Sequence, residues 1–431
     1  MKLQLFLVSF IIFTSAIDTG YFWQITDIHS QWFYKTGSDP ELGCQAGSGN
    51  AGKFGSFHCD TPSVLTDSAF QFMQSKLKNP DFIVWTGDIM PHLKVMKYVK
   101  HDEDVLIEAT RNFTNLVSKY FRDVPLVPVL GNHDVEPHAH QWAGVDRSSV
   151  YKRVLELFRQ HIPSSQDTLF LHGGYYEICP HVDWCFLLLN TNPYFTLDKQ
   201  AGDIEDPLDQ FVYLETKLQS YRKAGKRALI ATHVPIGVSS AQPFFIDMWP
   251  THHNRLMNIL KKNADLIIGY LAGHEHTDSF RVMRNENGHS FPVFAAPAIL
   301  VEAHDVAKVG HLGNNPGVRL FKYDRATGDL LDYEQYWMNL TLSNEKGVAL
   351  WNLEYRASSF FGIENLNGDS MMEAYHKLVD CPELFHEYWT YQHVLKPKPK
   401  ISDDARRIHL CGIKYIDLLD VYLCHLGRKD L

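Results

Sequence analysis

Residues 266–276 read Leu-Ile-Ile-Gly-Tyr-Leu-Ala-Gly-His-Glu-His, an apolar run of strand length that ends in a glycine and two histidines. The run lacks polar alternation, so it predicts a central strand buried on both faces. Residues two apart in an extended segment point to the same side, so His274 and His276 can face one cavity. With 27 glycines and 23 histidines in 431 residues, chance would produce far fewer than one Gly-His-x-His motif.

Five more apolar runs of strand length lie upstream, and each ends in a polar or glycine-containing turn. They cover residues 22–26, 82–86, 124–130, 185–189 and 227–232. Segments with helical spacing separate several of these runs, at residues 63–78, 106–120, 151–160 and 210–222. Alternation of buried strands with helices predicts an α/β architecture with layered sheets.

The pattern changes in the last third of the chain. Residues 291–299, 318–323 and 330–340 are expected to be successive strands that complete a sheet. The chain beyond Ser343 reads as mostly helical, with helices expected at residues 351–355, 371–379 and 383–394 before the stiff basic break Lys396-Pro-Lys-Pro-Lys400. We therefore expect a main domain over residues 20–342 and a helical C-terminal subdomain over residues 343–431.

The amino terminus predicts secretion. Met1-Lys2, an apolar run to about Phe13 and the small residues Thr14-Ser15-Ala16 fit a signal peptide over residues 1–16. That run is too short to span a membrane, so we expect a soluble product that is extracellular or in the lysosomal lumen. Two glycosylation sequons, at Asn112 and Asn339, agree with secretion.

Composition and cysteine content limit the class of protein further. The fraction of apolar residues, 45%, excludes a disordered chain, and the net charge of −9 offers no attraction for nucleic acid polymers or anionic membranes. The chain is expected to be a monomer. Seven cysteines suit an oxidising compartment, with local bridges expected at Cys44–Cys59, Cys179–Cys185 and Cys411–Cys424 and Cys381 left as a buried free thiol.

Most of the expected central strands end in side chains that can bind a metal. In open α/β sheets, ligands bind beyond the carboxyl ends of the strands, where these side chains fall. Each element alone is a weak signal, and we interpret His138, His140 and the pair His252-His253 as exposed loop residues. The ordered set gives the specificity, and its members are Asp27, His29, Asp88, Asn132, His233, His274 and His276.

The order Asp-x-His, Gly-Asp, Gly-Asn-His-Asp, His and Gly-His-x-His resembles that of calcineurin-like metallophosphoesterases. Segments 85–92, 189–192, 232–237 and 314–319 narrow this to a resemblance to acid sphingomyelinase and its secreted phosphodiesterase relatives. The carboxyl-terminal segment 351–355 and the Cys411/Cys424 spacing resemble that family too. The resemblance implies a four-layer sandwich of two mixed β-sheets flanked by helices.

The resemblance also implies roles for the predicted ligands. One metal would take Asp27, His29 and His276, the other Asn132, His233 and His274, and Asp88 would bridge the two. Four imidazoles, one amide and two carboxylates suit Zn²⁺ better than Mg²⁺ or Ca²⁺, and the family also implies two zinc ions per chain.

The expected reaction is attack by a metal-bridging hydroxide on the phosphorus of a phosphodiester. The leaving alkoxide must then receive a proton, and the resemblance makes His92 and His133 the candidate catalytic residues, one of them the general acid. Asp134 could orient His133 in the tautomer that this role requires.

The substrate class is the least determined part of the prediction. Relatives that hydrolyse sphingomyelin carry a saposin domain before the phosphoesterase fold, and the first expected strand at Phe22 leaves no room for one. This favours nucleotides and CDP-choline-like molecules, with sphingomyelin as the alternative. The aromatic segment 242–250 is either an exposed lip for lipid or nucleobase, or a loop packed on the sheet.

Two other classes of protein fit the sequence less well. The metal-binding tyrosine of purple acid phosphatases and the Gly-Asp-x-Val-Asp-Arg-Gly motif of protein phosphatases are absent, which favours a diesterase over a phosphomonoesterase. A secreted binding protein that keeps the fold without catalysis is the remaining alternative. Degenerate enzymes usually lose a ligand, whereas all seven expected ligands are present here.

Overall fold

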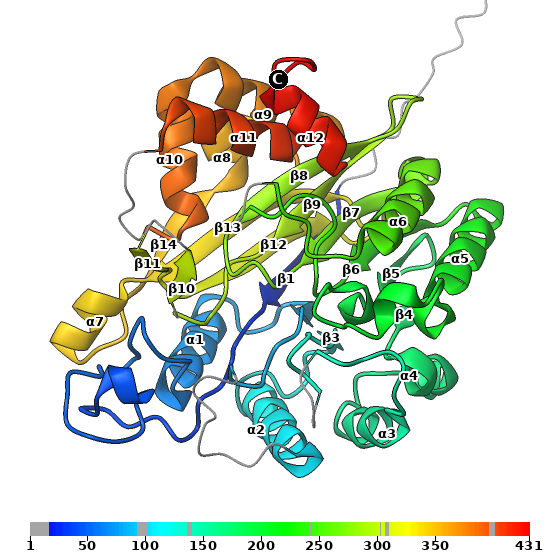
Figure 1. Cartoon of the computed structure of the whole chain (residues 1–431). Coiled ribbons are helices and arrows are strands. Elements are labelled where there is room, and N and C mark those ends of the chain that lie inside the picture. The colour runs from blue at the N-terminus through cyan, green and yellow to red at the C-terminus, as the bar shows by residue number, and fades with distance from the viewer. Residues whose placement is uncertain are drawn as a thin grey trace, which may run out of the picture.

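The computed structural model describes residues 17–92, 102–135, 140–240, 244–301, 303–306, 310–395 and 401–431. Two mixed sheets of six strands each form its interior (Figure 1). The expected signal peptide, His138 and the basic break at residues 396–400 lie outside the described residues.

The first sheet has the strand order β14-β13-β12-β1-β2-β3. Its first three strands in the chain are parallel to one another, and the three late strands add to β1 in antiparallel fashion. The strands are β1 (Thr19–Ile25), β2 (Phe82–Trp85), β3 (Leu126–Pro128), β12 (Gly317–Asp324), β13 (Leu330–Met338) and β14 (Trp351–Arg356).

The second sheet has the order β4-β5-β6-β7-β9-β8, with antiparallel strands only at its two edges. A separate antiparallel pair joins β10 (Ala303–Val306) and β11 (Gly310–Gly313). The strands of the second sheet are β4 (Tyr176–Ile178), β5 (Trp184–Leu188), β6 (Arg227–Ala231), β7 (Ile267–Ala272), β8 (Ser279–Arg284) and β9 (Ser290–Ala295).

Side chains that alternate along β1 divide between the two faces of the first sheet. The ring of Phe22 stacks on Phe82 at 4.8 Å, and Phe82 meets Phe186 of β5 in the second sheet at 5.2 Å. The next side chain, Trp23, points the other way and contacts Phe72 of helix α1 (Ser63–Lys76), with the ring centroids 6.5 Å apart. Because successive strand residues face opposite sides, one run of apolar residues fills both the core between the sheets and the core under the helices.

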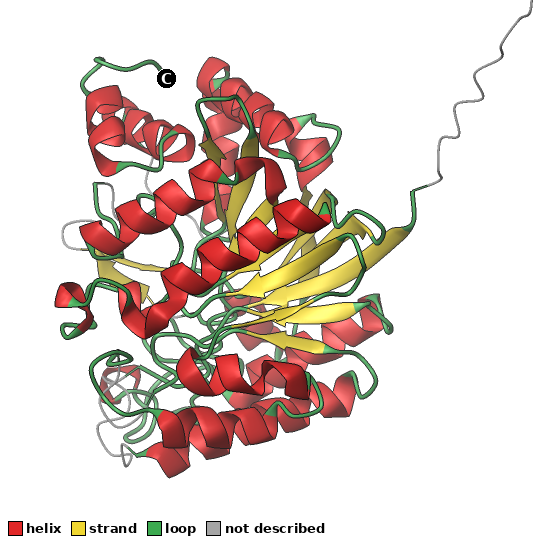
Figure 2. Ribbon diagram, turned by 90° about the vertical axis from the view of Figure 1, so that its right-hand side faces the viewer, coloured by secondary structure: helices red, strands yellow, loops and turns green. Residues whose placement is uncertain are grey.

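Helices cover the outer faces of both sheets. Leu229 of β6 belongs to the core between the sheets, whereas its neighbour Ile230 packs with residues of α5 and α6. Figure 2 shows the strands in the interior with helices around them. The predicted four-layer α/β sandwich is therefore confirmed. Its helices are α1 (Ser63–Lys76), α2 (Glu103–Tyr120), α3 (Ser148–Leu157), α4 (Asp167–Gly173), α5 (Gln210–Ala224) and α6 (Pro250–Lys262).

The carboxyl-terminal region is mostly helical, as expected. Its helices gather at one end of the molecule, coloured orange to red in Figure 1, where α9 and α11 pack against β8. They are α8 (Ala357–Phe361), α9 (Gly368–Asp380), α10 (Pro382–Gln392), α11 (Asp403–Lys414) and α12 (Leu418–His425). Helix α7 (Leu340–Lys346), yellow in Figure 1, lies apart from this group.

Three sequence expectations about these elements are wrong. Residues 351–355 are not helical but form the edge strand β14, which pairs with β13 across the boundary expected near residue 342. Residues 291–299 supply β9, which belongs to the second sheet rather than joining the late strands of the first. The pair His252-His253 lies in α6, where both side chains are buried because this turn of the helix faces the sheet.

All three expected disulfides are present: Cys44–Cys59, Cys179–Cys185 and Cys411–Cys424. They agree with an oxidising, extracellular environment. Cys381 is free, but it is exposed at the junction of α9 and α10 rather than buried. In the described part of the chain, no helix has the length and apolar character needed to cross a membrane.

Candidate metal centre

The predicted ligands follow β1, β2, β3, β6 and β7, and the carboxyl ends of these strands meet where the two sheets adjoin. Asp88 lies in the middle of the group. Its Oδ2 atom is 3.4 Å from Nε2 of His29 and 3.2 Å from Nε2 of His233. One carboxylate oxygen therefore faces a histidine from each sheet, which is the position required of a bridging ligand.

The side chains expected to share the first metal lie on one side of Asp88. Nε2 of His276 is 3.3 Å from Oδ1 of Asp27, and Nε2 of His29 is 3.9 Å from the same oxygen. The ring centroids of His29 and His276 are 5.1 Å apart, although the residues are far apart in the sequence. The three side chains thus point at one common space that is the size of a single ion.

The side chains expected to share the second metal lie on the other side of Asp88. Oδ1 of Asn132 is 2.7 Å from Nε2 of His233 and 2.7 Å from Nδ1 of His274. The backbone N–H of His274 donates to the carboxylate of Asp27, at 2.9 Å to Oδ2. That hydrogen bond joins the two halves of the group.

The tautomers of two histidines show why a cation fits here. Nδ1 of His29 donates to the carbonyl of Met90 at 2.8 Å, and Nδ1 of His233 donates to the carbonyl of Thr86 at 2.7 Å. In the neutral imidazoles, each Nε2 is then an unprotonated lone pair directed at an oxygen of Asp88. Nε2 of His29 is buried and has no hydrogen-bond partner among the described residues. Acceptors facing acceptors in a buried site fit a bound cation.

Electrostatics lead to the same requirement. Burial alone would lower the pKa of His233. The nearby carboxylate of Asp88 has the opposite and larger effect, so the pKa is raised to about 9. In the absence of a metal, the site therefore attracts a proton onto a ligand nitrogen. A divalent ion would supply the positive charge and displace that proton.

The backbone around the ligands adopts the left-handed region, which side chains other than glycine rarely occupy. Such strain concentrates at functional sites, where the surrounding fold imposes it. The ligands with positive φ are Asp27 (49°), His29 (42°), Asp88 (62°), His274 (71°) and His276 (58°).

Two motif glycines allow the loops to approach one another. A Cβ atom on Gly131 would lie 2.0 Å from Oδ1 of Asp88, and one on Gly273 would lie 2.0 Å from Oγ1 of Thr26. No side chain fits at either distance. The glycine that precedes Asn132 and the glycine that precedes His274 are therefore required for the packing of the ligand loops.

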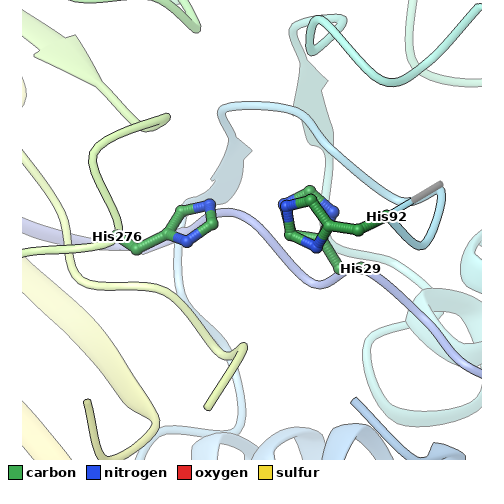
Figure 3. A group of neighbouring side chains, drawn as sticks. All are labelled: His29, His92 and His276. Carbon is green, nitrogen blue, oxygen red and sulfur yellow. The ribbon is translucent and has the colours of Figure 1, made fainter. Parts of the chain in front are cut away.

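The two candidate catalytic histidines lie beside the ligands. The ring of His92 stacks on that of His29 at 4.0 Å, with His276 opposite them (Figure 3). The ring of His133 stands edge-on to His92 at 4.8 Å, and its backbone N–H donates to Oδ1 of Asp88 at 2.8 Å. Burial lowers the pKa of His133 well below its ordinary value.

Asp134 does not orient His133, contrary to the sequence expectation. Its carboxylate accepts hydrogen bonds from the backbone N–H groups of Asp88, Ile89 and Gly131, at 2.7–2.9 Å. Burial, with a contribution from the charge of Asp88, raises the pKa of Asp134 to about 6. Its role is to hold the loops after β2 and β3 together.

Two residues of this site were not predicted from the sequence. The carboxylate of Asp60 binds His92, with Oδ1 2.9 Å from the ring Nδ1. His140, which we expected to be an exposed loop residue, is half-buried instead and its Nδ1 accepts from Nδ2 of Asn132 at 2.9 Å. Neither belongs to a recognisable motif, since each is identified only by a partner brought close by folding.

A pocket of about 470 Å³ opens over the ligands. Its wall combines the histidines with the apolar side chains of Phe195, Leu197 and Phe245. The aromatic segment that contains Phe245 combines the two alternatives expected for it, an exposed lip and a packed loop. Phe245 is 40% exposed, whereas Met248 is buried. Residues 241–243 of this segment lie outside the described residues.

Comparison with known families agrees with this geometry. The family model "Calcineurin-like phosphoesterase" matches residues 20–278, and the model "Acid sphingomyelin phosphodiesterase C-terminal region" matches residues 291–428. These matches define a metal-dependent phosphodiesterase.

Relatives align over nearly the whole chain. Sphingomyelinase phosphodiesterase C of Dictyostelium discoideum is 32% identical over 96% of both chains. Human acid sphingomyelinase-like phosphodiesterase 3b is 31% identical, and human cyclic GMP-AMP phosphodiesterase SMPDL3A is 30% identical, each over 94% of this chain and 90% of the relative. The chain belongs to the acid sphingomyelinase-like phosphodiesterase family.

Proposed function

We propose that this protein is a secreted phosphodiesterase with two zinc ions, acting on small soluble phosphodiesters and phosphoanhydrides. Asp27, His29 and His276 would bind one zinc ion, and Asn132, His233 and His274 the other, with Asp88 between them. The proposal rests above all on one observation: Oδ2 of Asp88 lies 3.4 Å from His29 Nε2 and 3.2 Å from His233 Nε2. Imidazole-rich donor sets favour zinc among the common divalent ions.

The protein side chains have defined tasks in this reaction. Bound zinc would supply an activated water and neutralise charge at the phosphate. His92 and His133 both line the pocket, within reach of a substrate placed over Asp88. One of these imidazoles donates a proton to the leaving oxygen, without which an alkoxide leaves slowly.

The pocket wall favours substrates with a flat or apolar group next to the phosphate. The rings of Phe195 and Phe245 can stack on a nucleobase beside the reacting group. One relative is named a cyclic GMP-AMP phosphodiesterase, which supports a nucleotide substrate. Sphingomyelin is the second candidate, because Leu197 and Phe245 are 46% and 40% exposed at the pocket and could contact lipid.

A substrate panel tests the proposal. Zinc-loaded protein should hydrolyse bis-p-nitrophenyl phosphate, ATP, CDP-choline and a cyclic dinucleotide, all faster than sphingomyelin in vesicles. Faster hydrolysis of sphingomyelin would reject the proposed substrate class. If the protein binds no stoichiometric zinc and leaves every substrate intact, it is a binding protein instead.

Substitution of the bridging carboxylate tests the metal site. Asp88→Ala should lose both zinc ions and at least about a thousandfold in kcat, because each ion loses a ligand. Asp67→Ala is the matched control, since Asp67 forms only a surface ion pair with Lys119 at 2.6 Å. Zinc content measured by mass spectrometry should fall in the first variant and not in the second. Retained activity in Asp88→Ala would refute the bridging role.

A further inference from the structure

Asp60 is a buried carboxylate that binds one catalytic candidate at two points. Its Oδ2 accepts from the backbone N–H of His92 at 2.6 Å, and its Oδ1 lies 2.9 Å from Nδ1 of the same residue. The side chain of Asp60 is fully buried, whereas that of His92 is 16% exposed. Hydrogen bonds to a buried carboxylate are stronger and more directional than those between neutral groups.

The contact with Asp60 fixes the role of each ring nitrogen of His92. A carboxylate accepts but does not donate, so Nδ1 of His92 is the protonated nitrogen that donates to Asp60. The ring has only one other nitrogen, Nε2, and His92 lines the pocket above the predicted ligands. Nε2 is therefore the nitrogen that can pass a proton to a substrate while Nδ1 stays bound to Asp60.

The segment that carries Asp60 is itself fastened to the first ligand loop. The backbone N–H of Asp60 donates to Oε1 of Gln31 at 3.1 Å, and that of Thr61 donates to the carbonyl of His29 at 3.1 Å. The preceding residue, Cys59, is bonded to Cys44. Since the His92 ring also stacks on His29, both partners of the Asp60–His92 pair are held against the same loop.

His133 lacks a comparable partner for its ring among the described contacts. The adjacent carboxylate, Asp134, is occupied by three backbone N–H groups. His133 itself uses its backbone N–H to bind Asp88. The geometry thus distinguishes two histidines that the sequence left equivalent.

We propose that Asp60 is the positioning residue that makes His92 the general acid; this rests on the proposed phosphodiesterase function. Water supplies the oxygen that forms the new bond to phosphorus and releases a proton to solvent. As the bond from phosphorus to the leaving oxygen breaks, that oxygen takes the proton of Nε2. His92 becomes neutral, keeps its Nδ1 proton on Asp60, and regains the Nε2 proton from solvent.

Two diesters with different leaving groups test this role. Bis-p-nitrophenyl phosphate releases an anion that needs no proton, whereas a dinucleoside monophosphate releases an alkoxide that does. Asp60→Ala should lower kcat for the dinucleoside ~10²-fold and for the nitrophenyl diester less than about threefold. KM and zinc content should stay unchanged. Combined with His92→Ala, it should add no further loss, because both substitutions remove the same step.

A conservative variant and a control protect the result from misfolding. Asp60→Asn keeps the size of the side chain but removes its charge, and should show the same dependence on the leaving group. Asp39→Asn, five residues before the Cys44–Cys59 disulfide, changes a carboxylate that accepts from the backbone N–H of Glu41 at the start of a short helix, and should have no such effect. Equal slowing of both substrates, or loss of zinc in Asp60→Asn, would overturn the positioning role.

A spectroscopic measurement separates this inference from the proposed function. In zinc-loaded protein with ¹⁵N-labelled histidine, the signal lost in His92→Ala should show a proton on Nδ1, shifted downfield by the carboxylate. Asp60→Asn should abolish that shift. Wild-type protein that cleaves neither diester but shows the shift would reject the phosphodiesterase proposal alone. Absence of the shift in an active wild type would reject the role of Asp60 alone.

Discussion

At the scale of single residues, the site depends on the orientation of the side-chain amide of Asn132. Asn132 can present either its oxygen or its nitrogen to a metal, and only the oxygen is a ligand. Its Nδ2 donates to Nδ1 of His140, so Oδ1 faces His233 and His274. Outer partners of this kind typically contribute a factor of ten or more in metal affinity.

We therefore expect His140→Phe to weaken zinc binding by about tenfold. Phenylalanine preserves the ring contacts of His140 with His133 at 4.5 Å and Phe195 at 5.7 Å, but it accepts no hydrogen bond from Asn132. Competition with a coloured chelator measures the affinity. His172→Phe, at an exposed histidine paired with Asp209, serves as the control. Equal affinities in wild type and His140→Phe would show that the amide is oriented by other contacts.

The ligands could be predicted from the sequence at this scale, but their supporting residues could not. Asp27, Asp88 and His274 each follow an apolar strand, and strand ends are local features of the sequence. Asp60 lies 32 residues before the histidine it binds. Nothing in the intervening sequence specifies that contact, because it depends on how two loops cross after the sheet has formed.

At the scale of elements, the buried strands were predicted well and the edge strand was not. β6 and β7 are apolar runs with almost every side chain buried. β14 exposes three of its six side chains and pairs only with β13. Its sequence, Trp-Asn-Leu-Glu-Tyr-Arg, does alternate apolar and polar residues as a strand does, but the run is only six residues long and is followed by helices, so a helix was expected there.

The carboxyl-terminal helices should respond to acid through His409 of α11. This half-buried imidazole packs against Trp389 of α10 at 4.7 Å, and removal from water lowers its pKa from 6.5 to about 4. The unfolded chain takes up a proton below pH 6.5, whereas the folded chain does so only near pH 4. Stability from this group is thus complete above pH 6.5 and is lost as the pH falls toward 4.

Substitution of His409 by glutamine tests that expectation. His409→Gln should flatten the fall in denaturation midpoint between pH 6.5 and 4, measured by urea unfolding at several pH values. His376→Gln, at an exposed histidine of α9, should leave the pH profile as in wild type. Identical slopes for wild type and His409→Gln would mean that other groups cause the acid sensitivity.

At the scale of the whole molecule, the site lies on the junction between the two sheets. The first sheet contributes Asp27, Asp88 and Asn132, and the second contributes His233 and His274. The rule that ligands bind at strand carboxyl ends predicts each half from the sequence. It does not say which strands share a sheet, and β9 was misassigned for that reason. Whether the carboxyl ends of the strands in one sheet face those in the other depends on how the two sheets pack together.

Because the ligands come from both sheets, zinc should stabilise the whole fold rather than one loop. Removing zinc leaves the carboxylates of Asp27 and Asp88 buried without the cations that would balance their charge, whereas bound zinc stabilises only the folded chain. Free zinc at a thousand times its dissociation constant contributes about 4 kcal/mol to the free energy of unfolding, which corresponds to a rise of several degrees in Tm.

Scanning calorimetry with zinc and with a chelator should show this shift in one cooperative transition. Asp88→Ala should show none. A zinc-dependent transition that involves only part of the unfolding enthalpy would mean that the metals stabilise a single sheet.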